Sequence, residues 1–272
     1  MLGSLIGDTV GSIYEFNNIK TKYFELCQPV MRFTDDSILT FATADWLLHG
    51  GEPGAYYFKY AMNYPNAGYG GSFISWVLDS RRRGSILPPY NSYGNGSAMR
   101  VSPVGWAYND VESVLKVAEA SAACTHNHIE GIKGAQALAL SVLMARQGIP
   151  VQEIRKYIST RFNYDMSLSV DEIRPRYSWS GLDGKIDSVT CQGSVPQALT
   201  CAFEATNFED AIRNAVSIGG DSDTIACMAG AVAEALFGVP RSLFEWIRTK
   251  MTQEMLVILD EFQSKYGCHV LP

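Results

Sequence analysis

Two short acidic stretches, nearly two hundred residues apart, each stand directly before an apolar run. The first is "FTDDSI" at residues 33–38 and the second is "GGDSDTIA" at residues 219–226. Ser, Thr and Asp are preferred at helix N-termini, where their side-chain oxygens accept free backbone N–H groups, so each stretch taken alone is typical of helix capping. Capping, however, uses only one or two of the oxygens that each stretch offers.

Together the two stretches offer four carboxylates and two hydroxyls, with no His or Cys beside them. These candidate ligands are Thr34, Asp35, Asp36, Asp221, Asp223 and Thr224. An all-oxygen set suits hard divalent cations such as Mg²⁺, Mn²⁺ or Ca²⁺ better than Zn²⁺. Four close carboxylates repel one another unless cations neutralise them, and two divalent ions about 3.5–4 Å apart are the natural arrangement. Spacing alone does not establish that the stretches meet, so capping and a shared metal site both stay open.

The elements that would position these residues are helices. Apolar residues recur at helical spacing along most of the chain, glycine and proline end several of these runs, and convincing β alternation is almost absent. The pattern predicts helices at residues 38–49, 54–63, 72–82, 111–124, 130–147, 151–162, 195–206, 208–218, 224–238 and 242–267. Residues 164–193 are predicted to form loops and short helical turns.

Composition restricts the class of protein. With 272 residues, 47% hydrophobic and 18% charged, we expect one domain covering residues 1–272 with a sizeable core. A formal net charge of −6 argues against an extended basic surface that binds the phosphate backbone of a nucleic acid. No apolar run approaches the roughly 20 residues of a membrane span, and Asp8 interrupts the N-terminal run too early for a secretory signal, so we expect a cytoplasmic protein with no membrane partner. The six cysteines form no C-x-x-C pair and are expected to be free thiols.

Two glycine-rich loops interrupt the helical pattern. They are "NAGYGGSF" at residues 66–73 and "PPYNSYGNGSAMR" at residues 88–100. Such loops occur where the backbone needs positive φ or must approach another group closely. We therefore expect the backbone of both loops to turn sharply or to lie close to another group.

Five motifs in a fixed order resemble the ADP-ribosylglycohydrolase family, which includes dinitrogenase-reductase-activating glycohydrolases and ADP-ribosyl-acceptor hydrolases. They are "GDTVGSIYE" (7–15), "TDDS" (34–37), "YGNGSAMR" (93–100), "THNHIEG" (125–131) and "GGDSDTIACMAGAVAEALFG" (219–238). One of these motifs alone would say little, whereas five in order over most of the chain are specific. The resemblance implies an all-α, orthogonally packed multi-helix bundle with a binuclear Mg²⁺ or Mn²⁺ centre at the base of a cleft.

On this resemblance the two acidic stretches are two halves of one metal cradle, and the six residues named above are its ligands. Ser37 stands where the family usually has a second Thr, so the hydroxyl is kept. Glu15 matches a glutamate that lies on a mobile flap beside the metals in some members. Asp35, Asp36 and Glu15 are therefore the candidate catalytic carboxylates, although a solvated helix-end charge remains the alternative for Glu15. Asp8 is expected to support a helix start or a ligand rather than to perform chemistry.

The resemblance also implies residues that contact the substrate. Backbone amides of "YGNGSAMR" are expected to face ADP-ribose, and Tyr93 either stacks on the adenine or simply packs. His126 is expected to bind the pyrophosphate or the ribose, with a core or capping histidine as the alternative, and Ile129 stands where the family often has Pro. The candidate substrate contacts are Gly70, Gly71, Ser72, Gly94, Asn95, Gly96, Ser97 and His126.

The implied reaction is metal-dependent hydrolysis of the bond from C1″ of ADP-ribose to an acceptor, through an oxocarbenium-like transition state. The substrate would be an ADP-ribosylated protein or a small ADP-ribosyl conjugate, and a nucleic-acid acceptor stays open although no feature indicates one. The glycine-rich loops look closer to members that act on serine-linked or O-acetyl-linked ADP-ribose than to arginine-specific ones. Two other functions stay open, a two-metal phosphoesterase and a non-catalytic ADP-ribose-binding protein.

Overall fold

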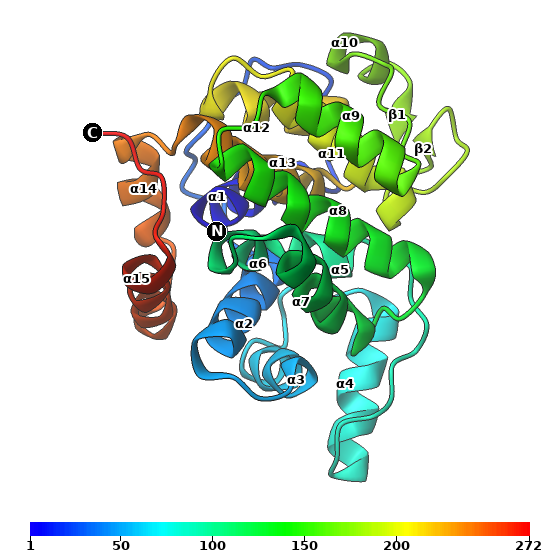
Figure 1. The fold of residues 1–272 in the computed structure, drawn as a ribbon, viewed down its shortest axis with the longest axis vertical. Coiled ribbons are helices and arrows are strands. Elements are labelled where there is room, and N and C mark those ends of the chain that lie inside the picture. Colours follow the sequence, from blue (N-terminus) through cyan, green and yellow to red (C-terminus); the bar gives the residue numbers. More distant parts are fainter.

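The computed structural model describes residues 1–272, and helices dominate it (Figure 1). The helices are α1 (Leu2–Gly11), α2 (Asp35–His49), α3 (Pro53–Asn63), α4 (Gly71–Arg83), α5 (Gly96–Met99), α6 (Ser102–Ala107), α7 (Val111–Ala123), α8 (Ile129–Arg146), α9 (Val151–Phe162), α10 (Val170–Ile173), α11 (Cys191–Phe203), α12 (Phe208–Ile218), α13 (Ser222–Phe237), α14 (Arg241–Arg248) and α15 (Gln253–Tyr266). The two strands, β1 (Tyr177–Ser178) and β2 (Gly181–Leu182), form one short antiparallel hairpin. The prediction of a mostly helical fold is confirmed.

Helices α1 and α13 lie side by side in the middle of the molecule (Figure 1). Gly3, Gly7 and Gly11 repeat every four residues and therefore share one face of α1. A Cβ atom on Gly7 would lie 2.0 Å from the carbonyl oxygen of Ala226, and one on Gly11 would lie 2.4 Å from the Cα atom of Asp223. Because this face carries no side chains, the two backbones touch, and the start of α13 lies beside the end of α1.

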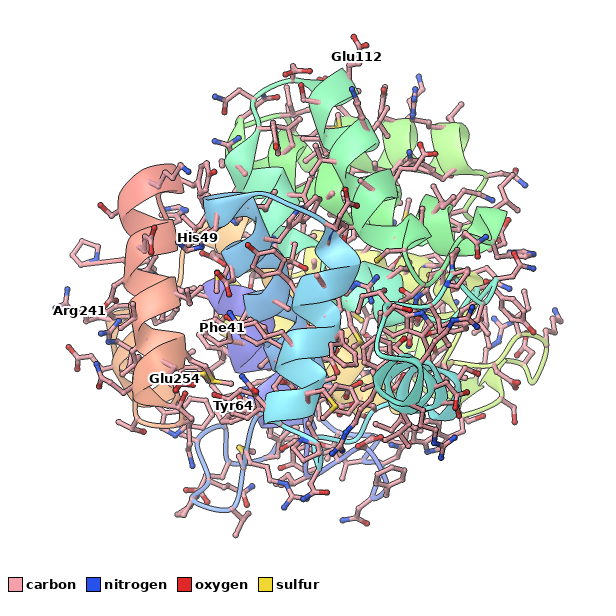
Figure 2. All side chains as sticks on the ribbon, turned by 90° about the horizontal axis from the view of Figure 1, so that it is seen from below. Phe41, His49, Tyr64, Glu112, Arg241 and Glu254 are labelled. Carbon is pink, nitrogen blue, oxygen red and sulfur yellow. The ribbon has the colours of Figure 1, made fainter.

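Helix α2, which begins with the first acidic stretch, is held between α1, α3 and α15. Figure 2 shows α15 alongside α2 and α3, with Tyr64 near their contact and Phe41 on α2. The hydroxyls of Tyr64 and Thr252 are 3.1 Å apart, and the hydroxyl of Tyr266 donates to the carbonyl oxygen of Leu47 at 3.0 Å. Phe41 is completely buried. These contacts fix the direction in which α2 presents its N-terminus.

Several helix boundaries differ from the sequence prediction. The predicted helix at residues 242–267 is two helices, because Thr252 caps a new N-terminus by accepting a backbone N–H. Helix α11 starts earlier than predicted, directly after its cap Thr190, so the end of the expected loop at residues 164–193 is helical. Helices α1, α5 and α6 are not predicted, because α1 is rich in glycine and the other two are short.

The buried apolar side chains form one contiguous core that extends from α1 to α15. The cysteines are free thiols, as predicted, and Cys191, Cys201 and Cys227 are buried in the core. None of the helices has both the length and the apolarity needed to cross a lipid bilayer.

Candidate metal centre and substrate cleft

The N-terminus of α2 is capped by a residue of another helix. The carboxylate of Asp8, on α1, accepts the backbone N–H of Thr34 at 2.9 Å and that of Ser37 at 3.0 Å. It also accepts the hydroxyls of both residues. Thr34 occupies the N-cap position, yet its own side chain makes no capping hydrogen bond. Asp8 therefore supports this helix start, as the sequence predicts, and the carboxylates of the first acidic stretch are not needed for capping.

The N-terminus of α13 is built in a similar way. Gly219 and Gly220 both have φ of 73°, a left-handed conformation that suits glycine and turns the chain sharply into α13. Asp221 is the N-cap residue, but its side chain makes no capping bond and instead accepts from Asn95 Nδ2 at 2.7 Å. Asp223 uses one oxygen, which accepts the backbone N–H of Thr224 at 2.9 Å. Capping thus accounts for few of the oxygens in the two stretches.

The two acidic stretches meet in space. Two overlapping groups have carboxylate oxygens within 4.8 Å of one another, namely Asp8, Asp36 and Asp223, and Glu15, Asp221 and Asp223. The hydroxyls of Thr34 and Thr224 each lie 3.3 Å from Asp36 Oδ2, which joins the first stretch to the second. Asp35 lines the same cavity as Asp36 and Asp223. All six predicted ligands are therefore brought together, and Asp8 is an additional candidate.

These carboxylates repel one another in a buried setting. Burial, followed by repulsion from Asp8, raises the pKa of Asp36 well above its usual range. Burial and repulsion from Asp221 raise the pKa of Asp223 in the same way, and raise that of Glu15 to about 7. Oxygen Oδ1 of Asp36 is buried and has no hydrogen-bond partner. Such a set costs free energy unless a cation neutralises it, so the arrangement fits divalent cations with oxygen ligands.

A cavity of about 330 Å³ opens over the acidic cluster, and we call it the acidic cleft. Seven predicted substrate contacts line it: Gly70, Gly71, Ser72, Gly94, Asn95, Gly96 and His126. Ser97 does not line the acidic cleft, because it is buried behind the loop and its hydroxyl donates to the carbonyl oxygen of Gly131 at 2.7 Å. Further lining residues were not singled out as contacts from the sequence, among them Tyr90, Arg100, Trp179 and Val189.

The His126 ring packs against the glycine-rich loop at residues 88–100. Its side chain is 5% exposed, and a Cβ atom on Gly96 would lie 3.1 Å from its Nε2 atom. A side chain at position 96 would therefore crowd the His126 ring, although Gly96 does not have a positive φ. Burial, and then the nearby charge of Arg100, lowers the pKa of His126 well below its usual value, so the ring is neutral at pH 7. The capping histidine is His128, which accepts the backbone N–H of Glu130 at the start of α8.

Two residues that were not predicted from the sequence add a buried positive charge and an aromatic ring to the lining of the acidic cleft. Arg100 is fully buried with its guanidinium 3.8 Å from the centre of the Tyr57 ring, and its place at the end of "YGNGSAMR" was the available signal. Trp179 precedes β2, in a stretch without any motif, and stacks on Phe16 with ring centres 5.7 Å apart. Phe16 is 83% exposed and adjoins Glu15. The stacked pair joins the segment after α1 to the hairpin at the edge of the cleft.

Comparisons with known proteins agree with this geometry. A model of the ADP-ribosylglycohydrolase family matches residues 1–265. ADP-ribosylhydrolase ARH3 of Mus musculus is 27% identical, over 90% of this chain and 85% of its own length. The protein of the same name from Bos taurus is 29% identical, over 90% and 86% of the two chains. A solved chain of an "ADP-ribosylglycohydrolase-related protein complex" has the same fold, with a TM-score of 0.74 and 21% identity over 97% of this chain and 95% of the other.

Proposed function

Because the chain belongs to the ADP-ribosylglycohydrolase family and is thus a hydrolase, we propose that it cleaves the C1″ bond of ADP-ribosyl conjugates with the help of two divalent cations. The substrates are ADP-ribosylated proteins or small ADP-ribosyl conjugates. Residues 1–272 act as a single domain in this proposal, which the one contiguous core supports. The cations would be Mg²⁺ or Mn²⁺, since both prefer oxygen ligands.

One observation carries the proposal. Carboxylates from three distant segments of the chain crowd together at one end of the acidic cleft, with Asp36 Oδ1 buried and unpartnered. The proposed metal ligands are Thr34, Asp35, Asp36, Asp221, Asp223 and Thr224, with Asp8 holding the first stretch in position. When bound, the cations supply positive charge that orients the hydroxyls of the distal ribose and polarises oxygen atoms near C1″.

The rest of the acidic cleft orients the substrate. Gly94, Asn95 and Gly96 of the glycine-rich loop at residues 88–100 line the cavity. The backbone N–H groups of Gly94 and Asn95 donate to Ser92 Oγ and to the carbonyl oxygen of Val189, which leaves the N–H of Gly96 for a phosphate or ribose oxygen. Neutral His126 lies against this loop and offers a ring nitrogen rather than a charge. Gly70, Gly71 and Ser72 form another wall of the same cavity. Holding the sugar in one orientation lowers the entropy cost of reaction.

Glu15 is the proposed proton acceptor. Its carboxylate lies within 4.8 Å of Asp221 and Asp223, and burial raises its pKa to about 7, a value that suits proton transfer near neutral pH. As an oxygen of water forms its bond to C1″, the bond from C1″ to the acceptor breaks and a carboxylate oxygen of Glu15 takes the proton of the water. The proton then passes to the departing acceptor. Asp35 and Asp36, as proposed metal ligands, are weaker bases than a free carboxylate.

The direct test is release of free ADP-ribose from arginine-linked, serine-linked and O-acetyl-linked substrates with Mg²⁺, with Mn²⁺ and with chelator. We expect turnover of at least one linkage, loss of that turnover in chelator, and loss in the Asp36→Asn and Asp223→Ala variants, which should stay folded by circular dichroism. Full activity in either folded variant would disprove the metal-centre proposal. Binding of ADP-ribose without turnover would instead favour a non-catalytic binding protein, and release of phosphate would favour a phosphoesterase.

A further inference from the structure

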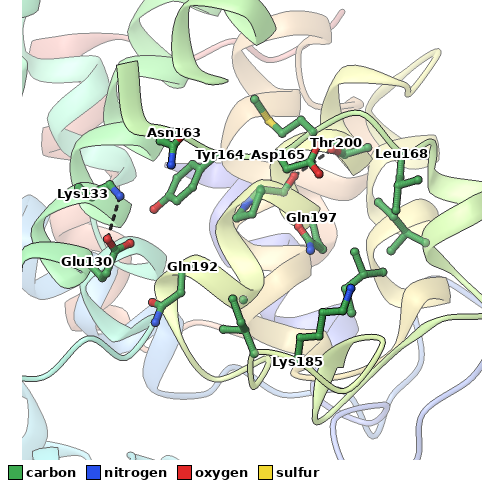
Figure 3. Close-up of a pocket in the computed structure, with 16 residues that line it drawn as sticks. Glu130, Lys133, Asn163, Tyr164, Asp165, Leu168, Lys185, Gln192, Gln197 and Thr200 are labelled. Carbon is green, nitrogen blue, oxygen red and sulfur yellow. Dashed lines mark hydrogen bonds and ion pairs between the residues drawn. The ribbon is translucent and has the colours of Figure 1, made fainter. Parts of the chain in front are cut away.

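A second cavity lies outside the acidic cleft and shares no residue with it. It has a volume of about 480 Å³ and lies between α8, the segment after α9, the hairpin β1–β2 and α11 (Figure 3), and we call it the hairpin pocket. Ile186 and Gln192 line the hairpin pocket, whereas Val189 between them lines the acidic cleft. Residues 186–192 therefore form the wall that separates the two cavities.

The hairpin pocket contains buried polar atoms that the protein does not satisfy. The side chain of Tyr164 is 5% exposed, and its hydroxyl is buried with no hydrogen-bond partner. Oxygen Oε1 of Gln192 is also buried and unpartnered. Figure 3 shows both side chains in the pocket. Because a buried polar group without a partner costs free energy, these two atoms are positioned for a ligand that supplies the missing hydrogen bonds.

A third polar group faces the same space. Gln197, on α11, is 7% exposed and lines the hairpin pocket, yet its side-chain amide forms no hydrogen bond with the protein. Pro196 precedes it inside the helix and has no backbone N–H to offer the carbonyl of Gln192. Helix α11 thus contributes two glutamine side chains to the pocket lining, and its hydrogen-bond ladder is interrupted beside them at Pro196.

The remaining walls determine what kind of ligand fits. Met166, Leu168, Ile173, Leu182 and Ile186 supply apolar surface. Four charged residues also line the pocket, and each has a partner within the protein. Glu130 pairs with Lys133 at 2.8 Å, Asp165 accepts the backbone N–H of Ser167, and Lys185 lies 3.7 Å from Asp183, so the pocket does not require a charged ligand. Burial raises the pKa of the Tyr164 phenol well above its usual value, so the hydroxyl stays protonated and can donate. Apolar walls with a few unpaired polar groups are typical of small-molecule sites.

We propose that the hairpin pocket is a second binding site, and that it takes a small neutral ring with an amide-type edge, as found in free nucleobases and aromatic carboxamides. Each glutamine amide offers one donor group and one acceptor, which match the acceptor and donor that such an edge carries. The apolar walls contact the faces of the ring. This site depends on neither the metal ligands nor turnover in the acidic cleft.

Binding is measured by ligand-observed NMR and by calorimetry on the full chain in Mg²⁺, with excess ADP-ribose added to compete for the acidic cleft. The probes are adenine, cytosine and uracil as free bases, and nicotinamide and benzamide as aromatic carboxamides. We expect at least one probe to bind. Whether that probe is a free base or an aromatic carboxamide identifies the class of ligand that the pocket takes. If no probe of either kind binds with or without ADP-ribose, the proposal is overturned, whatever the outcome of the hydrolysis test.

Variants locate the bound probe. Gln192→Leu and Gln197→Leu should each weaken binding by at least tenfold, and the matched exposed control Gln253→Leu should leave it unchanged. Tyr164→Phe should weaken binding without lowering the melting temperature, because the hydroxyl has no partner within the protein. Probe affinity that is the same in wild type and in all three pocket variants would place the probe elsewhere and overturn the proposal.

Discussion

At the scale of single residues, the acidic cleft assigns different tasks to chemically similar carboxylates. Asp8 accepts four hydrogen bonds from Thr34 and Ser37, and these bonds hold the N-terminus of α2 in place. Asp36 keeps one oxygen without any partner. Glu15, in the segment after α1, is less buried than either of them. Position, rather than residue type, therefore separates the supporting, ligating and proton-transferring roles that we propose.

Replacing Glu15 tests the proton-transfer role. Glu15→Gln should lower kcat by about 10²–10⁴-fold, because an amide of the same shape cannot accept the proton. In the wild-type protein activity should rise with pH as Glu15 loses its proton, since Glu15 must be deprotonated to act, and this rise should disappear in the variant. The pH profile of kcat checks both points.

The control for that experiment is Glu25→Gln, which changes an exposed glutamate in the same segment. Its rate and pH profile should match those of wild type. A Glu15→Gln variant with an unchanged rate and profile would show that another group takes the proton.

At the scale of elements, close packing of α1 on α13 places the carboxylates. Gly7→Ala should destabilise the protein by about 3 kcal/mol, because the new Cβ atom would lie 2.0 Å from the carbonyl oxygen of Ala226 and the helices would have to separate. The matched control is Gly54→Ala in α3, where the nearest atoms are 3.5 Å away and the change should stay within about 1 kcal/mol. Urea unfolding measures both. Equal stabilities of the two variants would contradict the packing argument.

The same elements show what could be predicted from the sequence. Gly, Pro and capping residues mark most helix ends, so α3, α4, α7, α8 and α9 agree with prediction to within a residue or so. Helix α1 was missed because its glycines lower helix propensity, while their benefit arises only from contact with α13. The break before α15 depends on one cap at Thr252 within an otherwise continuous apolar pattern.

The candidate site was predictable to a different degree. The residue types indicated a site for a hard cation. Sequence spacing does not show that residues 34–36 lie near residues 221–224, because this proximity depends on tertiary structure. The prediction that they share one site came from the family resemblance. Asp8 as a candidate ligand, and Trp179 at the cleft, depend on tertiary contacts without a local signal. The hairpin pocket was likewise not predictable from the sequence, because its polar residues come from α8, from the segment after α9 and from α11.

At the scale of the whole molecule, the acidic cluster couples stability to cation binding and pH. The folded-state pKa values of Asp35, Asp36 and Asp223 are raised well above their usual range by burial, and that of Glu15 is raised to about 7. The folded protein in chelator therefore binds more protons than the unfolded chain, so its stability falls as pH rises from about 4 through 7. The melting temperature in chelator should be lower at pH 8 than at pH 6.

Divalent cations should reverse that trend, because they bind the ionised carboxylates that only the folded chain assembles. Saturating Mg²⁺ or Mn²⁺ at about 100 times its dissociation constant should add about 2.7 kcal/mol of stability, with a larger gain at pH 8 than at pH 6. The Asp36→Asn variant should show a smaller pH dependence in chelator. Identical melting temperatures with cation and with chelator at pH 8 would refute this coupling.

The pairing of α1 with α13 also has a consequence for biosynthesis. All ten residues of α1 are buried in the finished protein, largely against a helix that lies more than two hundred residues further along the chain. At about 5–20 residues per second, the ribosome takes roughly 10–40 seconds to deliver that partner. Throughout this interval α1 lacks its main native partner, so the apolar side chains that α13 covers stay exposed to chaperones or to aggregation until α13 has been synthesised.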